Sequence, residues 1–224
     1  MNKIISIFIF WLFFWLGGWV FLFNIIPGGL GLIDRRLFLM TGKSGFVFLA
    51  GLGMLLAILA TLFFYKKLFN QLNLFSFQID KLNTFFLSVC VLLLAISLFS
   101  IFLIRGKNLS ILLPYFLVVV FYYSCNAFFQ QLINFGLFQE GLSKIVSPTL
   151  TILIVSILFG LSHFLAILQG EKFSGVLILS LLGFLLGLIF SWLRLKENSI
   201  FPGFLLHFSF YLFWNGPLLF LLTR

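Results

Sequence analysis

Two histidines, His163 and His207, lie inside long apolar runs of this chain, and the sequence contains no others. An imidazole can act as a general base, a metal ligand or a hydrogen-bond donor, and polar groups within membrane-like segments are costly unless they face a partner or a cavity. Each histidine alone is also compatible with a hydrogen-bonded interior imidazole. The amides Asn126, Gln130 and Asn134 recur every four residues in a preceding run, which predicts that they share one face of a helix.

Gln131 lies beside this polar stripe, which has a purely structural explanation as well. Amide hydrogen bonds between membrane helices contribute about 0.6–2 kcal/mol each, enough to account for the stripe without a site. Ser162, directly before His163, and Cys125 on the earlier run are alternative nucleophiles. Neighbouring residues of a helix point about 100° apart, so we do not expect Ser162 and His163 to pair.

The residues around His163 match a known sequence motif. Phe159 and His163 form an FxxxH segment within FGLSHFL, and a Gly-x-x-x-Gly run, a short basic loop and a Pro-preceded helix bearing His207 follow. This order, over roughly residues 115–216, resembles the CPBP family of CAAX-protease and bacteriocin-processing intramembrane metalloproteases, also called Abi proteins. In that family a glutamate and the FxxxH histidine activate a water, and a later histidine and asparagine hold the oxyanion.

The sequence departs from the family at most of its catalytic groups. The first family motif is EExxxR and the third is HxxxN or HxxxD, whereas the matching positions are Gln130, Gln131 and Phe135, and Tyr211. A carboxamide cannot act as a general base. The resemblance therefore implies a degenerate catalytic set of Gln130, His163 and His207, and we expect the cleft to be lined by Gln131, Asn134, Asn126, Tyr211 and Phe159.

Two other arrangements could provide a catalytic site: a first motif displaced along the chain, and a bound metal. Gln139, Glu140 and Lys144 reproduce the spacing of a QExxxK variant, but this register shortens the separation from His163 and predicts Glu140 in a loop. Two imidazoles and an amide oxygen form a weak zinc site, because catalytic zinc usually has three His or carboxylate ligands. We expect no bound metal or other cofactor, with zinc only if the family activity persists.

The elements that position these groups are apolar helices. Hydrophobic residues make up 62% of the chain and charged residues 8%, which excludes an ordinary soluble domain. The sequence predicts an all-α membrane bundle of about seven helices, with three spans in residues 1–110 and a CPBP-like four-helix core in residues 111–224. The spans are predicted near residues 4–26, 46–65, 85–104, 111–138, 150–168, 174–193 and 200–222.

The basic residues and the aromatic runs have structural explanations. The net charge of +9 arises from basic residues in the breaks between spans, which we expect to face lipid headgroups rather than nucleic acid. The aromatic runs at residues 13–15 and 121–123 are predicted to pack against lipid.

Three functions remain for a bundle of this kind. We expect a multi-pass protein of a bacterial inner membrane, in contact with lipid, that has lost protease activity and binds a membrane protein or peptide. The rival is a working intramembrane endopeptidase that cleaves C-terminal or leader peptides with an unconventional base. A small transporter is a third, weaker alternative.

Overall fold

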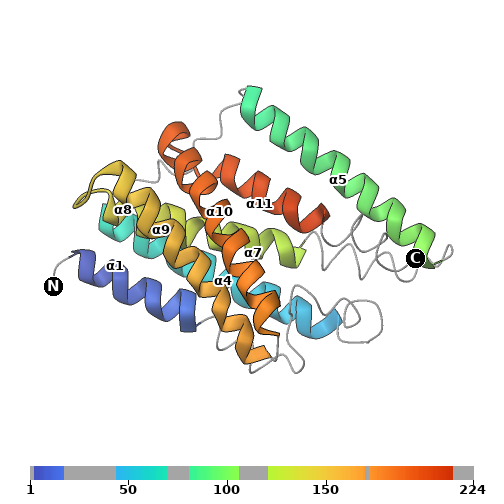
Figure 1. The fold of residues 1–224 in the computed structure, drawn as a ribbon, viewed down its shortest axis with the longest axis horizontal. Helices are drawn as coiled ribbons and strands as arrows, with labels where there is room; N and C mark the ends of the chain where they lie inside the picture. Colours follow the sequence, from blue (N-terminus) through green and yellow to red (C-terminus); the bar gives the residue numbers. More distant parts are fainter. Residues whose placement is uncertain (1–2, 18–43, 70–80, 106–120, 170–171, 214–224) are drawn as a thin grey trace.

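The computed structural model describes residues 3–17, 44–69, 81–105, 121–169 and 172–213, which are helices joined by short turns (Figure 1). No strand occurs among these residues, and the predicted all-α fold is confirmed. In chain order the elements are α1 (Lys3–Trp11), the π-helical η1 (Leu12–Leu16), α4 (Ser44–Phe69), α5 (Lys81–Arg105), α7 (Tyr123–Gln130), the π-helical η4 (Gln131–Phe138), α8 (Gln139–Leu142), α9 (Pro148–Ser162), the 3₁₀-helical η5 (His163–Gln169), α10 (Phe173–Glu197) and α11 (Phe201–Phe213).

Each predicted span contains helix in its described part. Four of the described helices are long and apolar enough to cross a membrane, at Gly51–Phe69, Lys81–Phe99, Pro148–Ile167 and Phe173–Glu197. Shorter apolar helices cover Ile4–Leu16 and Phe201–Phe213. α4 and α10 extend about one turn beyond their predicted C-terminal ends, because Lys and Arg favour the last turn of a helix, where the backbone carbonyls are exposed. The remaining parts of the predicted spans, at 18–26, 111–120 and 214–222, and the boundary after residue 110 lie outside the described residues.

Local sequence sets the ends of α9 and α10. The Ser147 hydroxyl caps α9 by accepting a hydrogen bond from the backbone N–H of Leu150 at 3.4 Å, and Pro148 occupies the first turn, where it costs no hydrogen bond. α10 ends at Asn198, whose φ of 48° is left-handed, a conformation that asparagine tolerates better than most residues. Both ends of this helical hairpin are thus specified by a few polar residues.

α9 and α10 pack closely along their length (Figure 1). A Cβ at Gly160 would lie 2.8 Å from the carbonyl oxygen of Ser180, and one at Gly187 would lie 3.0 Å from the Cα of Ser156. Within a bilayer the hydrophobic effect does not drive helices together. Close packing of the backbones does, and small residues permit it. Gly160 and Gly187, the second glycine of the Gly-x-x-x-Gly run, are therefore packing residues.

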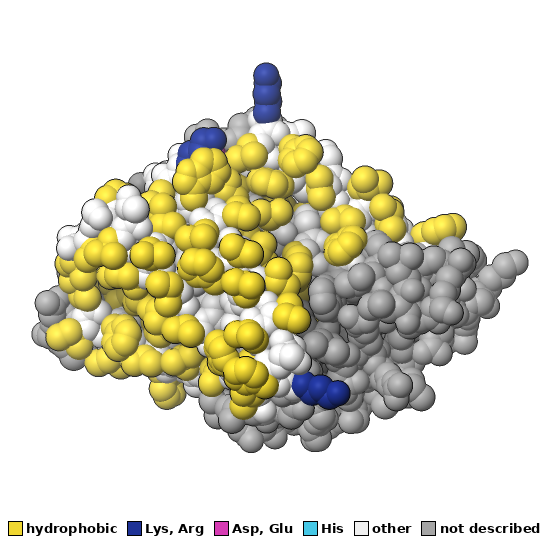
Figure 2. Space-filling model, viewed as in Figure 1, with side chains coloured by type: hydrophobic (Ala, Val, Ile, Leu, Met, Phe, Trp, Pro, Cys, Tyr) yellow, Lys and Arg dark blue, Asp and Glu magenta, His cyan; other side chains and the backbone are white. Residues whose placement is uncertain are grey.

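The other helices surround the segment that runs from α7 through η4 to α8. α4 packs on α7 and η4, α1 packs on η4 and α8, and α5 lies at the edge of the bundle against α11 (Figure 1). The face visible in Figure 2 is almost continuously hydrophobic where it is described, with Lys and Arg side chains at its margins. Such a surface suits contact with lipid tails.

The predicted lipid-facing aromatic runs are only partly lipid-facing. Phe13 is 73% exposed, but Trp15 is 2% exposed and stacks on Phe159 with ring centroids 6.0 Å apart. In the second run Tyr122 and Tyr123 are buried. The correction has a physical reason: adjacent residues of a helix point in different directions, so a run of aromatic residues cannot all face the lipid.

Candidate functional site

The candidate side chains come from three segments of the chain. Asn126, Gln130, Gln131 and Asn134 lie on α7 and η4; Phe159 and His163 lie at the junction of α9 and η5; and His207 and Tyr211 lie on α11. α11 packs on α7, while α9 packs on η4. Most of these side chains are buried, including both glutamines, which are each 1% exposed.

Gln130 and Tyr211 are joined by a direct hydrogen bond. The Gln130 amide donates to the Tyr211 hydroxyl oxygen at 2.9 Å and to Asn126 Oδ1 at 3.0 Å, and the Asn126 amide donates to the same hydroxyl oxygen at 3.0 Å. Gln130 Oε1 is buried and has no hydrogen-bond partner within the described part of the chain. The three side chains are therefore bonded to one another, and within the described residues the Gln130 oxygen is an unused acceptor.

Gln131 lies against the His207 imidazole. Its Nε2 is 3.5 Å from His207 Nδ1, at the outer limit of a hydrogen bond, and an amide nitrogen can only donate in such a contact. The neutral ring then accepts at Nδ1 and carries its proton on Nε2. Gly203 provides the space for this amide, since a Cβ there would lie 2.5 Å from Gln131 Oε1.

Aromatic rings surround the rest of His207. Its ring stacks on Tyr211, with centroids 4.9 Å apart, and on Phe190, with centroids 5.1 Å apart. Phe159 meets it edge to face at 6.2 Å. The imidazole is 4% exposed, so it lies in a mainly apolar environment with a single weak polar contact among those that the structure describes.

His163 is fixed by the backbone of its own helix. Its Nδ1 donates to the carbonyl oxygen of Phe159 at 2.8 Å, because a carbonyl can only accept. Ser162 donates to the same oxygen at 2.7 Å. The serine therefore bonds to the backbone rather than to the imidazole, as expected from the angle between adjacent helical residues. The Phe159 ring lies edge to face with His163, with centroids 5.1 Å apart, and so contacts both histidines.

Asn134 has a different partner from the other two amides of the stripe. Its Oδ1 accepts a hydrogen bond from the Trp11 indole of α1 at 2.8 Å, and its amide donates to the Gln130 carbonyl oxygen at 2.9 Å. The shared helical face predicted for the three amides ends at Gln130, because the chain is π-helical from Gln131 to Phe138 and turns less per residue. Asn126 and Gln130 meet at Tyr211, and Asn134 does not join them.

Comparison with known proteins agrees with the motif order. A family model described as type II CAAX prenyl endopeptidase Rce1-like matches residues 111–213. We call residues 111–213, which are similar to that family, the Rce1-like region. The resemblance to the CAAX-protease family is thereby confirmed, and with the apolar helices it identifies the chain as an integral membrane protein. No curated protein and no solved structure matches the chain.

Phe135, which the motif spacing aligns with the arginine of the first family motif, lies in the aromatic core of the Rce1-like region. Phe135 is fully buried. Its ring lies edge to face with Phe159 at 5.3 Å and with Phe190 at 5.5 Å. An arginine side chain at this position would place a cation beside two aromatic rings, so a phenylalanine suits these surroundings.

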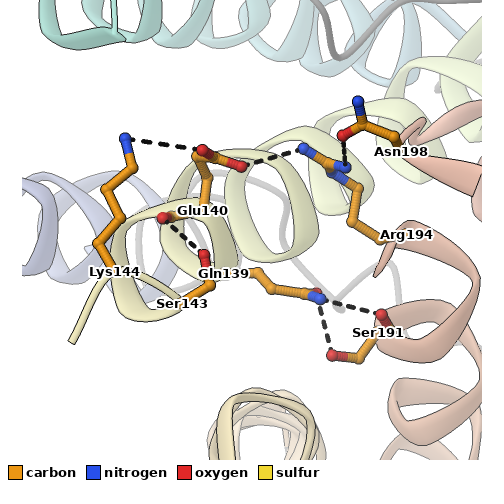
Figure 3. A network of polar contacts seen from close by, with 7 residues as sticks. All are labelled: Gln139, Glu140, Ser143, Lys144, Ser191, Arg194 and Asn198. Atoms are coloured by element: carbon orange, nitrogen blue, oxygen red, sulfur yellow. Dashed lines mark hydrogen bonds and ion pairs between the residues drawn. The ribbon is translucent and has the colours of Figure 1, made fainter. Parts of the chain in front are cut away.

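The residues of the QExxxK variant, Gln139, Glu140 and Lys144, lie in a polar network between helices (Figure 3). Gln139 Nε2 donates to the Ser191 carbonyl oxygen, and the Ser191 hydroxyl donates to Gln139 Oε1, both at 2.9 Å. Glu140 pairs with Arg194 at 3.2 Å and with Lys144 at 3.6 Å. Glu140 lies on α8, not in the predicted loop, and its carboxylate is neutralised by two cations.

Sequence reasoning missed the role of Arg194. The basic residues between spans were predicted to face lipid headgroups, but the Arg194 side chain is 6% exposed. Besides Glu140, it donates to Asn198 Oδ1 at 2.9 Å (Figure 3). A charge near a helix end is usually solvated, and here the carboxylate on a distant helix and the Asn198 oxygen make burial favourable. The sequence holds no signal that pairs these two residues.

The residues present do not fit the metal that the family resemblance implies. Among the described residues, no three His, Cys, Asp or Glu side chains lie close enough together to hold a metal ion. Gln130 offers a neutral oxygen where the family has a carboxylate, and a catalytic zinc normally requires three His or carboxylate ligands. The arrangement can bind and orient a hydrogen-bonding group, and its described side chains include no carboxylate.

Proposed function

We propose that this membrane protein is a catalytically inactive relative of the CAAX-type endopeptidases and that it binds a membrane protein or peptide. The observation that carries the proposal is the hydrogen bond between Gln130 and Tyr211. These residues occupy the positions of the catalytic glutamate and of the oxyanion-binding asparagine in the family motifs. Their side chains contact each other.

The chemistry of the replaced groups supports loss of catalysis. A carboxamide has no useful basicity, so Gln130 can orient a water but cannot remove its proton. The Tyr211 hydroxyl oxygen already accepts two hydrogen bonds, from Gln130 and Asn126. Removing one essential group typically slows an enzyme by several orders of magnitude, and here two motifs are altered together.

The unused acceptor supports a binding role. Gln130 Oε1 is buried and lacks a partner within the described residues, and a buried acceptor of this kind costs about 1–3 kcal/mol. A backbone N–H of a bound peptide would satisfy it. We infer that the partner is apolar and lies within the membrane, because aromatic rings surround the neighbouring His207.

A binding and cleavage assay tests the proposal. The probe is a fluorescein-labelled, farnesylated peptide ending in a CAAX sequence, added to the purified protein in lipid nanodiscs. We expect fluorescence anisotropy to show binding and mass spectrometry to show an intact peptide. Gln130→Met removes the acceptor, together with the amide that donates to Tyr211 and Asn126, at similar volume. It should weaken binding at least about tenfold, the equivalent of one hydrogen bond of about 1.4 kcal/mol to the peptide.

Restored variants separate inactivity from misassignment of the site. Gln130→Glu with Tyr211→Asn returns the two family groups without disturbing the aromatic core around Phe135, and cleavage by this variant would support the proposed active-site ancestry. Wild-type cleavage that is abolished by His163→Ala would overturn the proposal in favour of a working endopeptidase. Ser88→Ala, at an exposed position of α5, is the control for both measurements.

A further inference from the structure

Three polar contacts hold α5 against α11. The Cys90 thiol donates to the carbonyl oxygen of Leu205 at 3.1 Å, and its sulfur lies 3.0 Å from the Ser209 hydroxyl oxygen. The Ser97 hydroxyl donates to the carbonyl oxygen of Leu212 at 2.8 Å. Cys90, Ser97 and Ser209 are all buried. Two of these contacts reach the backbone of α11, so they act on the helix itself and not on a movable side chain.

The contacts bracket the part of α11 that carries the site. Leu205 and Leu212 lie on either side of His207 and Tyr211 in the sequence, and Ser209 lies between them. The donors on α5 and the acceptors on α11 are each one heptad apart, which places each set on one side of its helix and requires the two helices to run parallel. These contacts therefore constrain both the axial position and the rotation of this segment.

α5 also packs apolar side chains on the bundle, among them Phe86 and Leu94, but apolar contact alone does not define a register. Its outward face carries exposed apolar residues, among them Phe85, Val91, Leu92 and Phe99, and Figure 1 shows the helix at the edge of the bundle. Lipid tails compete with apolar side chains for apolar contact, so directional hydrogen bonds and close packing decide how membrane helices align. The donors of α5 provide that direction.

We propose that Cys90 and Ser97 are positioning residues that hold His207 and Tyr211 in place opposite Gln131 and Gln130. α5 lies outside the Rce1-like region, so this assigns a role at the site to a helix beyond the family match. The inference shares its site with the proposed function but does not depend on peptide binding. It concerns where two side chains lie in the free protein.

Histidine NMR tests the inference without a ligand. The chain has two histidines, so ring-labelled histidine gives one set of resonances for His163 and one for His207. The His207 signals are sensitive to position because its ring stacks on Tyr211 and Phe190. In lipid nanodiscs, the combined variant Cys90→Ala and Ser97→Ala should shift the His207 signals and leave those of His163 unchanged.

Two further variants make the result specific. The single variant Cys90→Ser keeps a hydrogen-bond donor and should give the wild-type His207 signals. The single variant Cys90→Ala removes the donor and should shift them. Ser88→Ala, on the same helix with its hydroxyl bonded to the Thr84 carbonyl oxygen, should shift neither histidine. If the double variant does not fold, the two Cys90 variants decide the question.

Two outcomes would overturn the inference. One is an unshifted His207 in a folded Cys90→Ala or double variant. The other is an equal shift of both histidines, which would indicate general loosening of the bundle. No peptide is present in the NMR experiment, so its failure would not contradict the proposed peptide binding. Failure of the binding assay would likewise not contradict the role of Cys90 and Ser97.

Discussion

Substitution of Gly183 by alanine should displace the His163 ring. A methyl group at Gly183 would lie 2.7 Å from Nδ1 and 2.9 Å from Cε1 of that ring. Because van der Waals contacts are most favourable at about 3.5 Å, the ring must move by roughly 0.8 Å. That movement stretches the 2.8 Å hydrogen bond from Nδ1 to the Phe159 carbonyl oxygen. The glycine thus keeps His163 in its position as well as allowing α9 and α10 to approach.

The expected loss of stability follows from three contributions. Overpacking of a close contact costs about 1–3 kcal/mol, and a lost hydrogen bond adds about 0.5–1.5 kcal/mol. Alanine returns up to about 1 kcal/mol relative to glycine within a helix. With the full alanine gain subtracted, the free energy of unfolding should fall by about 0.5–3.5 kcal/mol.

Unfolding with increasing sodium dodecyl sulfate in mixed micelles measures this loss, and the histidine ring resonances report the displacement. Gly175→Ala is the matched control, because it lies on the same helix and a Cβ there meets nothing within 4 Å. The reasoning is refuted if Gly183→Ala is as stable as Gly175→Ala and the His163 resonances do not move.

Two other predictions concern contacts between distant helices, and the same unfolding assay measures both. Trp11→Phe removes the donor that Asn134 Oδ1 accepts at 2.8 Å, and should cost about 1–2 kcal/mol; an unchanged midpoint would contradict this. Glu140→Gln leaves the buried Arg194 without its carboxylate and should cost about 2–4 kcal/mol. Glu197→Gln breaks an ion pair with an exposed lysine and should change stability by at most about 0.5 kcal/mol; equal effects of these two glutamine variants would contradict the assigned importance of Arg194.

Much of the fold was predictable because apolar length is a strong signal. A membrane helix must satisfy its own backbone, so each long apolar run indicates one helix. The motif spacing also located the family region, and the structure brings Gln130 next to Tyr211 and Gln131 next to His207. The fixed spacing of the motifs carries that information along the chain.

The contacts that depend on distant partners were not predictable. Trp11 belongs to an apolar run, and nothing in that run predicts a hydrogen bond to η4. In sequence, Arg194 resembles a solvated loop residue, and only the fold brings Glu140 beside it. The π-helical turn after Gln130 changes which side chains share a face, and helical periodicity assumes an α-helix. Each of these depends on tertiary packing rather than on local pattern.

The bond between Trp11 and Asn134 also has a consequence for how the protein is made, because 123 positions separate the two residues. A growing chain delivers α1 to the bilayer before η4 has been translated. The indole N–H then lies in hydrocarbon without this acceptor, which is an unfavourable state that persists until the later helix inserts. Halves of the protein encoded on two separate messages would each carry one unmatched polar group and should find each other in the membrane through it.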